Sequence, residues 1–222
     1  MDKKKIPVYN GTLRSHLLNV PKEIYECSGI CIFGRLIKSI VFSTDVAIIK
    51  NINADAVIAV YPFTPQPSIA NAIISVSDAP VFTGVGGGLT SGERSVRLAE
   101  EAEHAGAFGV VVNSPMPPKD IAEIKKRVDI PVIATVVSGK QDIKERIEAG
   151  ADILNVSAAA DTPEVVKFIK SQFPDIPIIA TGGPTPETIE ATVNAGANAI
   201  TYTPPTNGEL FAISMQKYRK CY

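Results

Sequence analysis

The chain has 222 residues, of which 45% are hydrophobic, and a formal net charge of −1. This length and composition suit one domain with a sizeable core. The near-neutral charge, without any basic run, argues against a nucleic-acid partner, which needs clustered lysine and arginine. No segment is long and apolar enough to span a bilayer, and residues 1–12 lack the hydrophobic core of a signal peptide. We therefore expect a cytoplasmic protein without a membrane partner.

Residues 1–37 precede the first predicted strand. The sequence NGTLRSHLLNVPKEIYE in this part predicts one or two short helices, interrupted at Pro21, so we expect a helical N-terminal extension packed on the rest of the chain or on a partner subunit. Arg14, His16 and Arg35 are candidates for a lid over a site. We expect the protein to be a homo-oligomer.

Residues 38–222 contain eight apolar runs rich in valine and isoleucine, each followed by a stretch of helical character. Continuous runs of this kind are typical of parallel strands that are buried on both faces. The predicted strands are Ser39–Thr44, Ala56–Tyr61, Val81–Val85, Phe108–Asn113, Val132–Val136, Ile153–Ser157, Ile178–Thr181 and Ala199–Thr203. The clearest predicted helices are Glu93–His104, Ile121–Val128, Lys140–Glu148, Glu164–Phe173 and Glu187–Asn194.

A repeat fixes how these elements are combined. DIPVIAT at Asp129–Thr135 recurs as DIPIIAT at Asp175–Thr181, and AGA at 149–151 recurs at 195–197, 46 residues later in both cases. A fixed period that contains a strand and a helix is the mark of a repeated supersecondary unit. The even spacing favours a single α/β domain, a (βα)8 TIM barrel, over an open doubly wound sheet.

In such a barrel the functional residues lie at the C-terminal ends of the strands and in the loops that follow them. The repeat register places hydroxyl or amide side chains at most of these ends, namely Asn113, Thr135, Asn155, Ser157, Thr181, Thr201 and Thr203. Asp45 is the one acid directly at a strand end, and Glu93 enters through the long loop after the third strand. We take these two as candidate proton-transfer groups, with a helix cap as the alternative for Asp45.

Two glycine-rich loops follow strands. VGGGLTSGERS at Val85–Ser95 matches neither a phosphate loop nor a dinucleotide fingerprint, but Gly86 and Gly87 allow close approach of backbone to a ligand, or a mobile lid. TGGPTPET at Thr181–Thr188 places Gly182 and Gly183 ahead of a helix, where exposed backbone N–H groups can bind phosphate. The alternative is that Gly182 and Gly183 only form a tight turn.

The segment IPIIATGGPTPETIEATVNAGANAI, residues 176–200, resembles the seventh unit of the phosphate-binding aldolase-type barrels. That group includes thiamine-phosphate synthase, indole-glycerol-phosphate synthase, inosine-monophosphate dehydrogenase and nitronate monooxygenase. The resemblance covers about residues 129–203 and implies that Gly182 and Gly183 bind the phosphate of a small molecule, with Thr181 and Thr203 beside them. The eighth strand departs from the pattern, because Pro204 and Pro205 follow it and have no N–H to donate.

Three functions fit these observations. The first is an isomerase or lyase that acts on a phosphorylated metabolite. The second is a non-catalytic sensor of such a metabolite, favoured by the scarcity of acids and bases at the strand ends. The third is an oxidoreductase that binds FMN by its phosphate at the same loop.

The absences narrow the chemistry. No strand ends in a lysine for a Schiff base, and no Ser-His-Asp arrangement supports a hydrolase. No HxH pair or acidic cluster predicts a metal site. Three cysteines, Cys27, Cys31 and Cys221, suggest a reducing compartment, and the spacing of the first two predicts buried thiols rather than a metal or redox pair.

Overall fold

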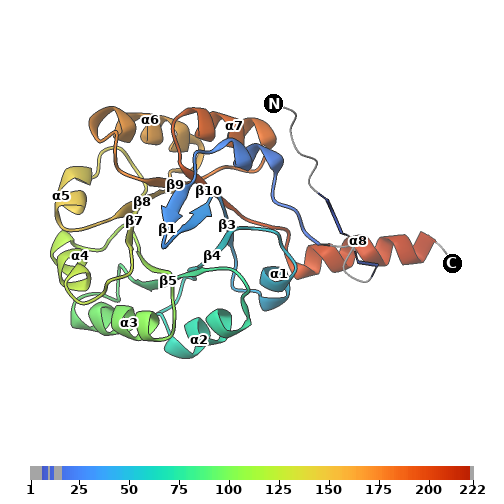
Figure 1. Cartoon of the computed structure of the whole chain (residues 1–222), viewed down its shortest axis with the longest axis horizontal. Helices are drawn as coiled ribbons and strands as arrows, with labels where there is room; N and C mark the ends of the chain where they lie inside the picture. Colours follow the sequence, from blue (N-terminus) through green and yellow to red (C-terminus); the bar gives the residue numbers. More distant parts are fainter. Residues whose placement is uncertain (1–6, 10, 13–16, 221–222) are drawn as a thin grey trace.

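The computed structural model describes residues 7–9, 11–12 and 17–220. Eight parallel strands form a closed barrel (Figure 1), in the order β10-β3-β4-β5-β6-β7-β8-β9. The prediction of a (βα)8 TIM barrel is confirmed. The barrel strands are β3 (Ser39–Phe42), β4 (Ala56–Ala59), β5 (Val81–Gly86), β6 (Gly109–Val112), β7 (Val132–Val136), β8 (Ile153–Val156), β9 (Ile178–Thr181) and β10 (Ala199–Tyr202).

In the described part of the chain, helices α1 to α7 surround the barrel and α8 projects from it (Figure 1). They are α1 (Val46–Lys50), α2 (Pro67–Val76), α3 (Glu93–His104), α4 (Pro118–Lys125), α5 (Ile143–Glu148), α6 (Thr162–Gln172), α7 (Pro186–Asn194) and α8 (Asn207–Lys220). A short 3₁₀ helix, η2 (Ala159–Asp161), precedes α6. Side-chain caps at Asp45, Asp142 and Thr185 fix the starts of α1, α5 and α7. These caps bind backbone N–H groups that have no partner within the helix.

The strand side chains alternate between two apolar layers. One layer fills the barrel interior and includes Ile40, Ile58, Phe82, Val111, Ile133, Ile153, Ile179 and Ala199. The other lies between the strands and the helices and includes Val110, Val132, Leu154, Ile178 and Ile200. Both faces of each strand are therefore buried, which is why the strands read as continuous apolar runs.

A recurring hydrogen bond gives the repeat a physical reason. The AGA triplets at 149–151 and 195–197 are each followed by a residue whose side-chain oxygen accepts a hydrogen bond from the first N–H of the preceding strand. Asp152 accepts from Val132 at 2.9 Å, and Asn198 accepts from Ile178 at 2.9 Å. Asp55 accepts from Ser39 in the same way, also at 2.9 Å. These bonds hold adjacent strands in register at the N-terminal end of the barrel.

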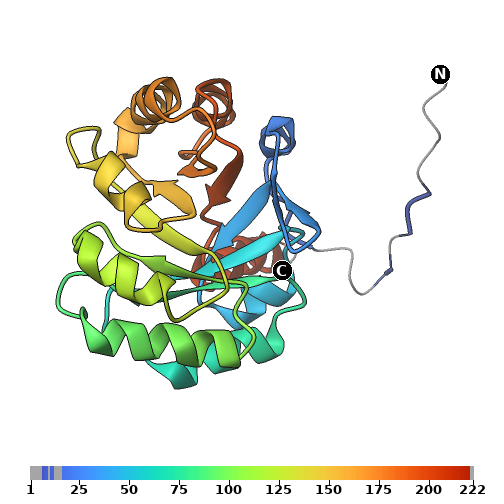
Figure 2. The ribbon, with the colours of Figure 1, turned by 60° about the vertical axis from the view of Figure 1, so that its left-hand side comes forward.

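The extension differs from its predicted helical form. Its described part contains one 3₁₀ helix, η1 (Lys22–Glu26), and an antiparallel hairpin of β1 (Ile30–Ile32) and β2 (Arg35–Ile37). Phe33 and Gly34 form the hairpin turn with φ of 46° and 78°, a conformation that suits a two-residue hairpin. The hairpin lies across the N-terminal end of the barrel (Figures 1 and 2), and its isoleucines join the interior layer.

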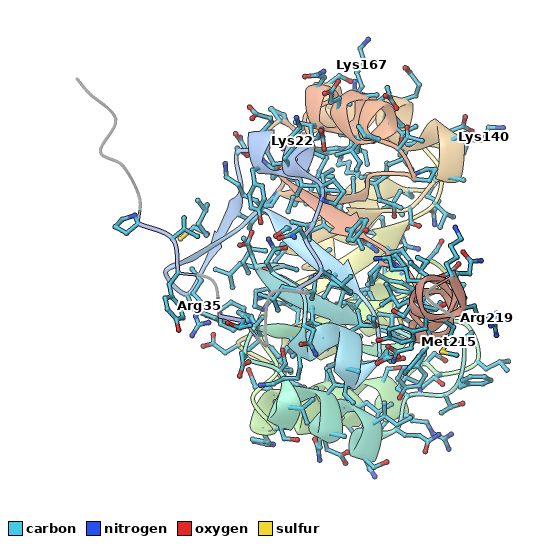
Figure 3. The ribbon with its side chains drawn as sticks, turned by 90° about the vertical axis from the view of Figure 1, so that its right-hand side faces the viewer. Lys22, Arg35, Lys140, Lys167, Met215 and Arg219 are labelled. Carbon is cyan, nitrogen blue, oxygen red and sulfur yellow. The ribbon has the colours of Figure 1, made fainter. Side chains whose placement is uncertain are left out.

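The lid hypothesis for Arg35 is wrong. Its guanidinium carbon lies 6.0 Å from the centre of the Phe108 ring, which precedes β6 at the N-terminal end of the barrel. Figure 3 shows Arg35 at one end of the molecule and Lys140, in the loop after β7, at the other. Arg14 and His16 lie outside the described residues.

The two described cysteines differ in exposure. Cys27 is buried, as predicted, and burial raises the pKa of its thiol to about 11. Cys31 is exposed, contrary to the prediction, because it is the outward-facing residue in the middle of β1. Within the described ranges, no three His, Cys, Asp or Glu side chains are grouped closely enough to hold a metal ion. The same ranges contain no helix that is long and apolar enough to cross a membrane.

We expect iodoacetamide at pH 8 to modify the exposed Cys31 at least ~100-fold faster than Cys27, because the Cys27 thiol is buried and a pKa of about 11 leaves only about one part in a thousand of it as thiolate at this pH. Peptide mass spectrometry after timed labelling measures both rates. The Cys31→Ser variant provides the control and should lose the fast modification at this peptide. Equal rates at the two cysteines would contradict the described burial.

Candidate functional site

The C-terminal end of the barrel opens into a cavity of about 290 Å³, here called the central chamber. Its lining consists of Phe42, Ile58, Val60, Val111, Asn113, Thr135, Asn155, Ser157, Thr181, Thr201 and Thr203. The structure thus brings together all the hydroxyl and amide residues that the repeat register places at strand ends. Every polar side chain in this lining is neutral.

These polar side chains leave hydrogen-bonding capacity unused. Asn155 donates to the Thr135 hydroxyl at 3.3 Å and Thr181 donates to the Ser157 hydroxyl at 3.4 Å, which are long contacts. Thr201 is 8% exposed, and its hydroxyl oxygen is buried without a partner among the described residues. A buried hydroxyl without a partner is costly, and a ligand could remove that cost only if the Thr201 side chain rotates to turn the hydroxyl into the central chamber.

Two further cavities adjoin the central chamber. The glycine-loop chamber, about 230 Å³, lies beside the loop after β5 and is lined by Tyr61, Gly84, Gly86, Gly87, Leu89 and Thr90, among others. The Asp45 chamber, about 530 Å³, is lined by Ser43, Thr44, Asp45, Tyr61 and the segment 203–206, among others. Val60 and Asn113 line all three cavities, which therefore form one continuous mouth.

The glycine-rich loop is closely packed. A Cβ at Gly86 would lie 2.2 Å from the Ser95 hydroxyl, and one at Gly87 would lie 2.5 Å from the Asn113 Cβ. The Gly87 N–H donates to the Thr90 carbonyl at 2.7 Å. Packing against Ser95 and Asn113 therefore requires these two glycines and shapes one wall of the mouth, while the predicted approach of the backbone to a ligand stays a prediction.

The two acid candidates occupy different places. Asp45 lines the mouth, and it caps α1 by accepting from the N–H groups of Ala47 at 2.9 Å and Ile48 at 3.2 Å. It also accepts from the Asn207 side-chain amide. The predicted cap is present.

Glu93 is the first residue of α3. It is exposed and forms an ion pair with Arg97 at 3.2 Å, and it lines none of the three chambers. Gly92, just before it, has a φ of 60°, and its N–H donates to the Asp120 carboxylate at 2.8 Å. The structure does not bring Glu93 to the mouth.

The second glycine pair has strict steric requirements. Gly182 is buried, its N–H lies 3.4 Å from the Thr201 carbonyl, and a Cβ there would lie 2.7 Å from the Ile200 side chain. Gly183 is exposed and has a φ of 82°. Neither glycine lines the three chambers, although Thr181 just before them does.

The start of α7, beyond this loop, is already capped. The Thr185 hydroxyl accepts from the Thr188 N–H at 3.4 Å. The Glu187 carboxyl accepts hydrogen bonds from the Glu187 backbone N–H and from the Thr185 hydroxyl, and these bonds lower its pKa. A phosphate at this helix would therefore have to displace the exposed Glu187 side chain.

Sequence reasoning missed the apolar wall of the central chamber. Phe42, Ile58, Val60 and Val111 line it. In sequence they are indistinguishable from core strand residues, because a barrel strand is apolar along its whole length. Phe42 is 39% exposed, which can be recognised only from the closed barrel.

The chain resembles known proteins in its fold and in part of its sequence. No family model matches it. The solved structures that it resembles include 2,3-dimethylmalate lyase, a PEP mutase/isocitrate lyase superfamily member, with a TM-score of 0.65, 14% identity and coverage of 83% of this chain and 81% of that one. Phosphonopyruvate hydrolase gives a TM-score of 0.63 and 17% identity, covering 84% and 80% of the two chains. These likenesses show that the fold is a TIM barrel.

Two curated relatives match part of this barrel, and both carry the name "Putative N-acetylmannosamine-6-phosphate 2-epimerase". The one from Staphylococcus saprophyticus is 31% identical over an alignment of 101 residues, and the match covers 38% of this chain and 44% of that protein. The one from Shouchella clausii is 30% identical over an alignment of 112 residues, and the match covers 43% of this chain and 48% of that protein. The match thus spans about half the length of these relatives. The predicted resemblance to aldolase-type barrels is confirmed at the level of the superfamily.

Proposed function

We propose that the protein is a metabolic enzyme of the isomerase or lyase type that binds a phosphorylated, hydroxyl-rich small molecule at the mouth. The central chamber carries this proposal. Its neutral hydroxyl and amide lining, together with the unpartnered Thr201 hydroxyl, complements the hydroxyl groups of a sugar-like molecule. A ligand with several carboxylates would require cationic partners, and the described residues that line this chamber include no lysine, arginine or histidine.

The phosphate is assigned to the loop before α7. Gly183 is exposed there with a left-handed φ, and the loop begins at Thr181 on the wall of the central chamber. Helix N-termini in this position are favourable phosphate sites in barrels of this kind. The names of both curated relatives specify a sugar phosphate, which supports the same ligand class. Thr203, which lines two of the chambers, lies at the end of the adjacent strand.

Asp45 is the proton-transfer group in this proposal, because it is the carboxylate among the residues that line the three chambers. Isomerisation or lyase chemistry next to a carbonyl requires such a group within reach of the substrate. The Asn207 amide holds one of its oxygens, and α1 holds the other. Asp45 is thus oriented by the segments that follow the adjacent strands β3 and β10.

A metabolite sensor is the second candidate, and the same hydrogen bonds favour it. Asp45 accepts two backbone N–H bonds and the Asn207 amide, so its lone pairs are largely engaged in a structural cap. Binding without turnover would then be the whole function of the mouth.

Thermal unfolding against a ligand panel tests the proposal. The panel comprises N-acetylmannosamine 6-phosphate, unphosphorylated N-acetylmannosamine, inorganic phosphate and FMN. A ligand at a hundred times its Kd stabilises by about 2.7 kcal/mol, and for a chain of this size the midpoint should rise ~5 °C or more. We expect the sugar phosphate to exceed both the sugar and the phosphate alone.

Proton NMR in deuterated water then separates the two candidates. An isomerase replaces a carbon-bound hydrogen of the sugar phosphate with deuterium and a lyase cleaves the molecule into new products, whereas a sensor gives the thermal shift with neither change. A shift with FMN alone would favour the oxidoreductase hypothesis, and no shift with any compound would refute the proposed ligand class.

A further inference from the structure

Asn113 lies where the three chambers of the mouth meet. It directly follows β6 and comes two residues after Val111, whose side chain belongs to the interior layer of the barrel. Because residues two apart along a strand share a face, the Asn113 side chain is directed into the mouth. Asn113 lines the central chamber, the glycine-loop chamber and the Asp45 chamber. A ligand group bound to it can therefore extend into two chambers at once.

The backbone of Asn113 is fixed, whereas its side chain has free hydrogen-bonding groups. Its N–H donates to the Gly86 carbonyl at 2.8 Å, and its carbonyl accepts from the Met116 N–H at 2.9 Å. Gly87 packs against the same residue so closely that a Cβ there would lie 2.5 Å from the Asn113 Cβ. The side-chain amide, in contrast, has no hydrogen-bond partner among the described residues. It offers a donor and an acceptor at a fixed place in the mouth.

The glycine-loop chamber beside Asn113 has an apolar wall. Two large side chains of this wall are open to solvent, since Leu89 is wholly exposed and Phe63 is 73% exposed. They come from the loops after the paired strands β4 and β5. The rest of the apolar lining consists of Val60, Pro62 and Pro65. Exposed apolar side chains that gather around one cavity, unlike single ones scattered over a surface, mark a binding site.

The same chamber is poorly suited to a phosphate. Its described lining includes no lysine, arginine or histidine. Pro62 and Pro65 have no N–H to donate, and the Gly87 N–H is already bonded to the Thr90 carbonyl at 2.7 Å. A neutral, apolar group therefore fits this chamber better than a charged one.

The turn that carries Leu89 is held at both ends. On one side Gly87 is bonded to Thr90, and on the other the Gly92 N–H donates to the buried Asp120 carboxylate at 2.8 Å. A side chain on a turn that is already ordered loses little further conformational freedom when a ligand covers it. Leu89 is thus placed to contact a ligand without rearrangement of the loop.

We infer that the ligand of the mouth carries an N-acyl group, whose amide binds the Asn113 side chain and whose acyl chain lies in the glycine-loop chamber against Leu89 and Phe63. An amide presents one N–H and one carbonyl, and the carboxamide of asparagine complements both. The chamber, of about 230 Å³, has room for more than a methyl group, because an apolar cavity of about 150 Å³ already holds benzene.

The order of the strands agrees with this arrangement. The loop after β9 is the proposed phosphate site, and β5, which precedes the glycine-rich loop, lies four places from β9 in the closed order of eight strands. The two loops are therefore on opposite sides of the mouth, with the central chamber between them. The inference rests on the proposed function for the phosphate and the hydroxyl groups, and it adds a substituent at the other end of the ligand.

A neutral fragment tests the acyl subsite by itself. N-Methylbutanamide has the amide and the acyl chain but neither sugar nor phosphate. In protein with ¹³C-labelled leucine methyl groups, we expect titration to millimolar concentration to shift the Leu89 resonances, which are assigned by their loss in Leu89→Ser. The resonances of Leu36, a 56% exposed leucine of β2 at the other end of the barrel, should not move. Asn113→Leu should weaken fragment binding about tenfold. An unshifted Leu89, or equal affinity in Asn113→Leu, would overturn the inference.

Sugar phosphates test the subsite in the complete ligand. Isothermal titration calorimetry compares mannose 6-phosphate, N-acetylmannosamine 6-phosphate and its N-butanoyl analogue. We expect the N-acetyl compound to bind about tenfold more tightly than mannose 6-phosphate, and the N-butanoyl compound at least ~4-fold more tightly again, the effect of one buried methylene. Leu89→Ser should remove the gain from the longer chain, and Leu36→Ser, the matched control, should keep it.

The outcomes separate this inference from the proposed function. Equal affinities for the three sugar phosphates would overturn the inference and leave the proposed ligand class in place. A Leu89 shift with the fragment, without binding of any sugar phosphate, would refute the proposed ligand class and support the acyl subsite.

Discussion

Replacing Thr201 with valine should stabilise the protein and weaken ligand binding at the same time. The Thr201 hydroxyl is buried in the wall of the central chamber without a partner among the described residues. Valine has nearly the same shape and no polar atom, so the desolvation cost of the hydroxyl disappears. We expect the free energy of unfolding to rise by about 1 kcal/mol and the thermal midpoint by roughly 2–4 °C.

The loss of binding follows from the same hydroxyl. Rotation of the Thr201 side chain would turn this hydroxyl into the central chamber, and a ligand group that bonds to it there would face a methyl group in Thr201→Val and lose its hydrogen bond. We expect about tenfold weaker binding of the sugar phosphate, measured by isothermal titration calorimetry.

Thr83→Val is the matched control. The Thr83 hydroxyl is also buried without a partner in the described chain, but it lines a separate cavity of about 20 Å³ near Gln66 and Glu101. Its replacement should leave ligand affinity unchanged. Equal affinity of Thr201→Val and wild type, or a loss of stability in Thr201→Val, would show that this hydroxyl does not contribute to a ligand site.

The contrast between the strand-end residues and Glu93 shows how far the sequence could predict this site. Strand-end residues were predictable because parallel strands in a closed barrel share one register. Counting from a repeated triplet therefore located Asn113, Ser157 and Thr203 correctly at the mouth. The prediction failed where a loop sets the direction of a side chain. Glu93 follows a glycine-rich loop whose path the repeat does not specify, and its side chain is exposed and paired with Arg97.

Other features depended on tertiary packing that no local pattern records. The hairpin of β1 and β2 has only three residues per strand, too short for a clear alternation, and its turn places Phe33 at a positive φ that is unusual for phenylalanine. The exposure of α8 could not be predicted from the sequence either, because its apolar residues resemble those of any helix that packs on a barrel. Whether a helix packs on its own chain is a property of the assembled structure.

Replacing Gly86 with alanine should produce the largest loss of stability among the substitutions considered. The new Cβ would lie 2.2 Å from the Ser95 hydroxyl and 2.6 Å from the Thr90 carbonyl oxygen, and the residue has a φ of 149°. Ser95 is fully buried and the Thr90 carbonyl accepts the Gly87 N–H, so neither atom can move without disturbing the loop. Overpacking and backbone strain together should cost about 4 kcal/mol.

Gly88→Ala in the same loop separates strain from packing. Gly88 has a φ of 75°, but no described atom lies within 4 Å of the position that an alanine Cβ would take, so only the conformational cost of about 1 kcal/mol applies. Urea unfolding of both variants gives the two free energies, and thermal midpoints should fall by roughly 8–16 °C for Gly86→Ala and 2–4 °C for Gly88→Ala. Similar losses in the two variants would mean that the loop relaxes around the new methyl group. A much larger loss at Gly86 would establish that close packing against Ser95 and Thr90, rather than mobility, is the reason for this glycine, and that the wall of the glycine-loop chamber is rigid.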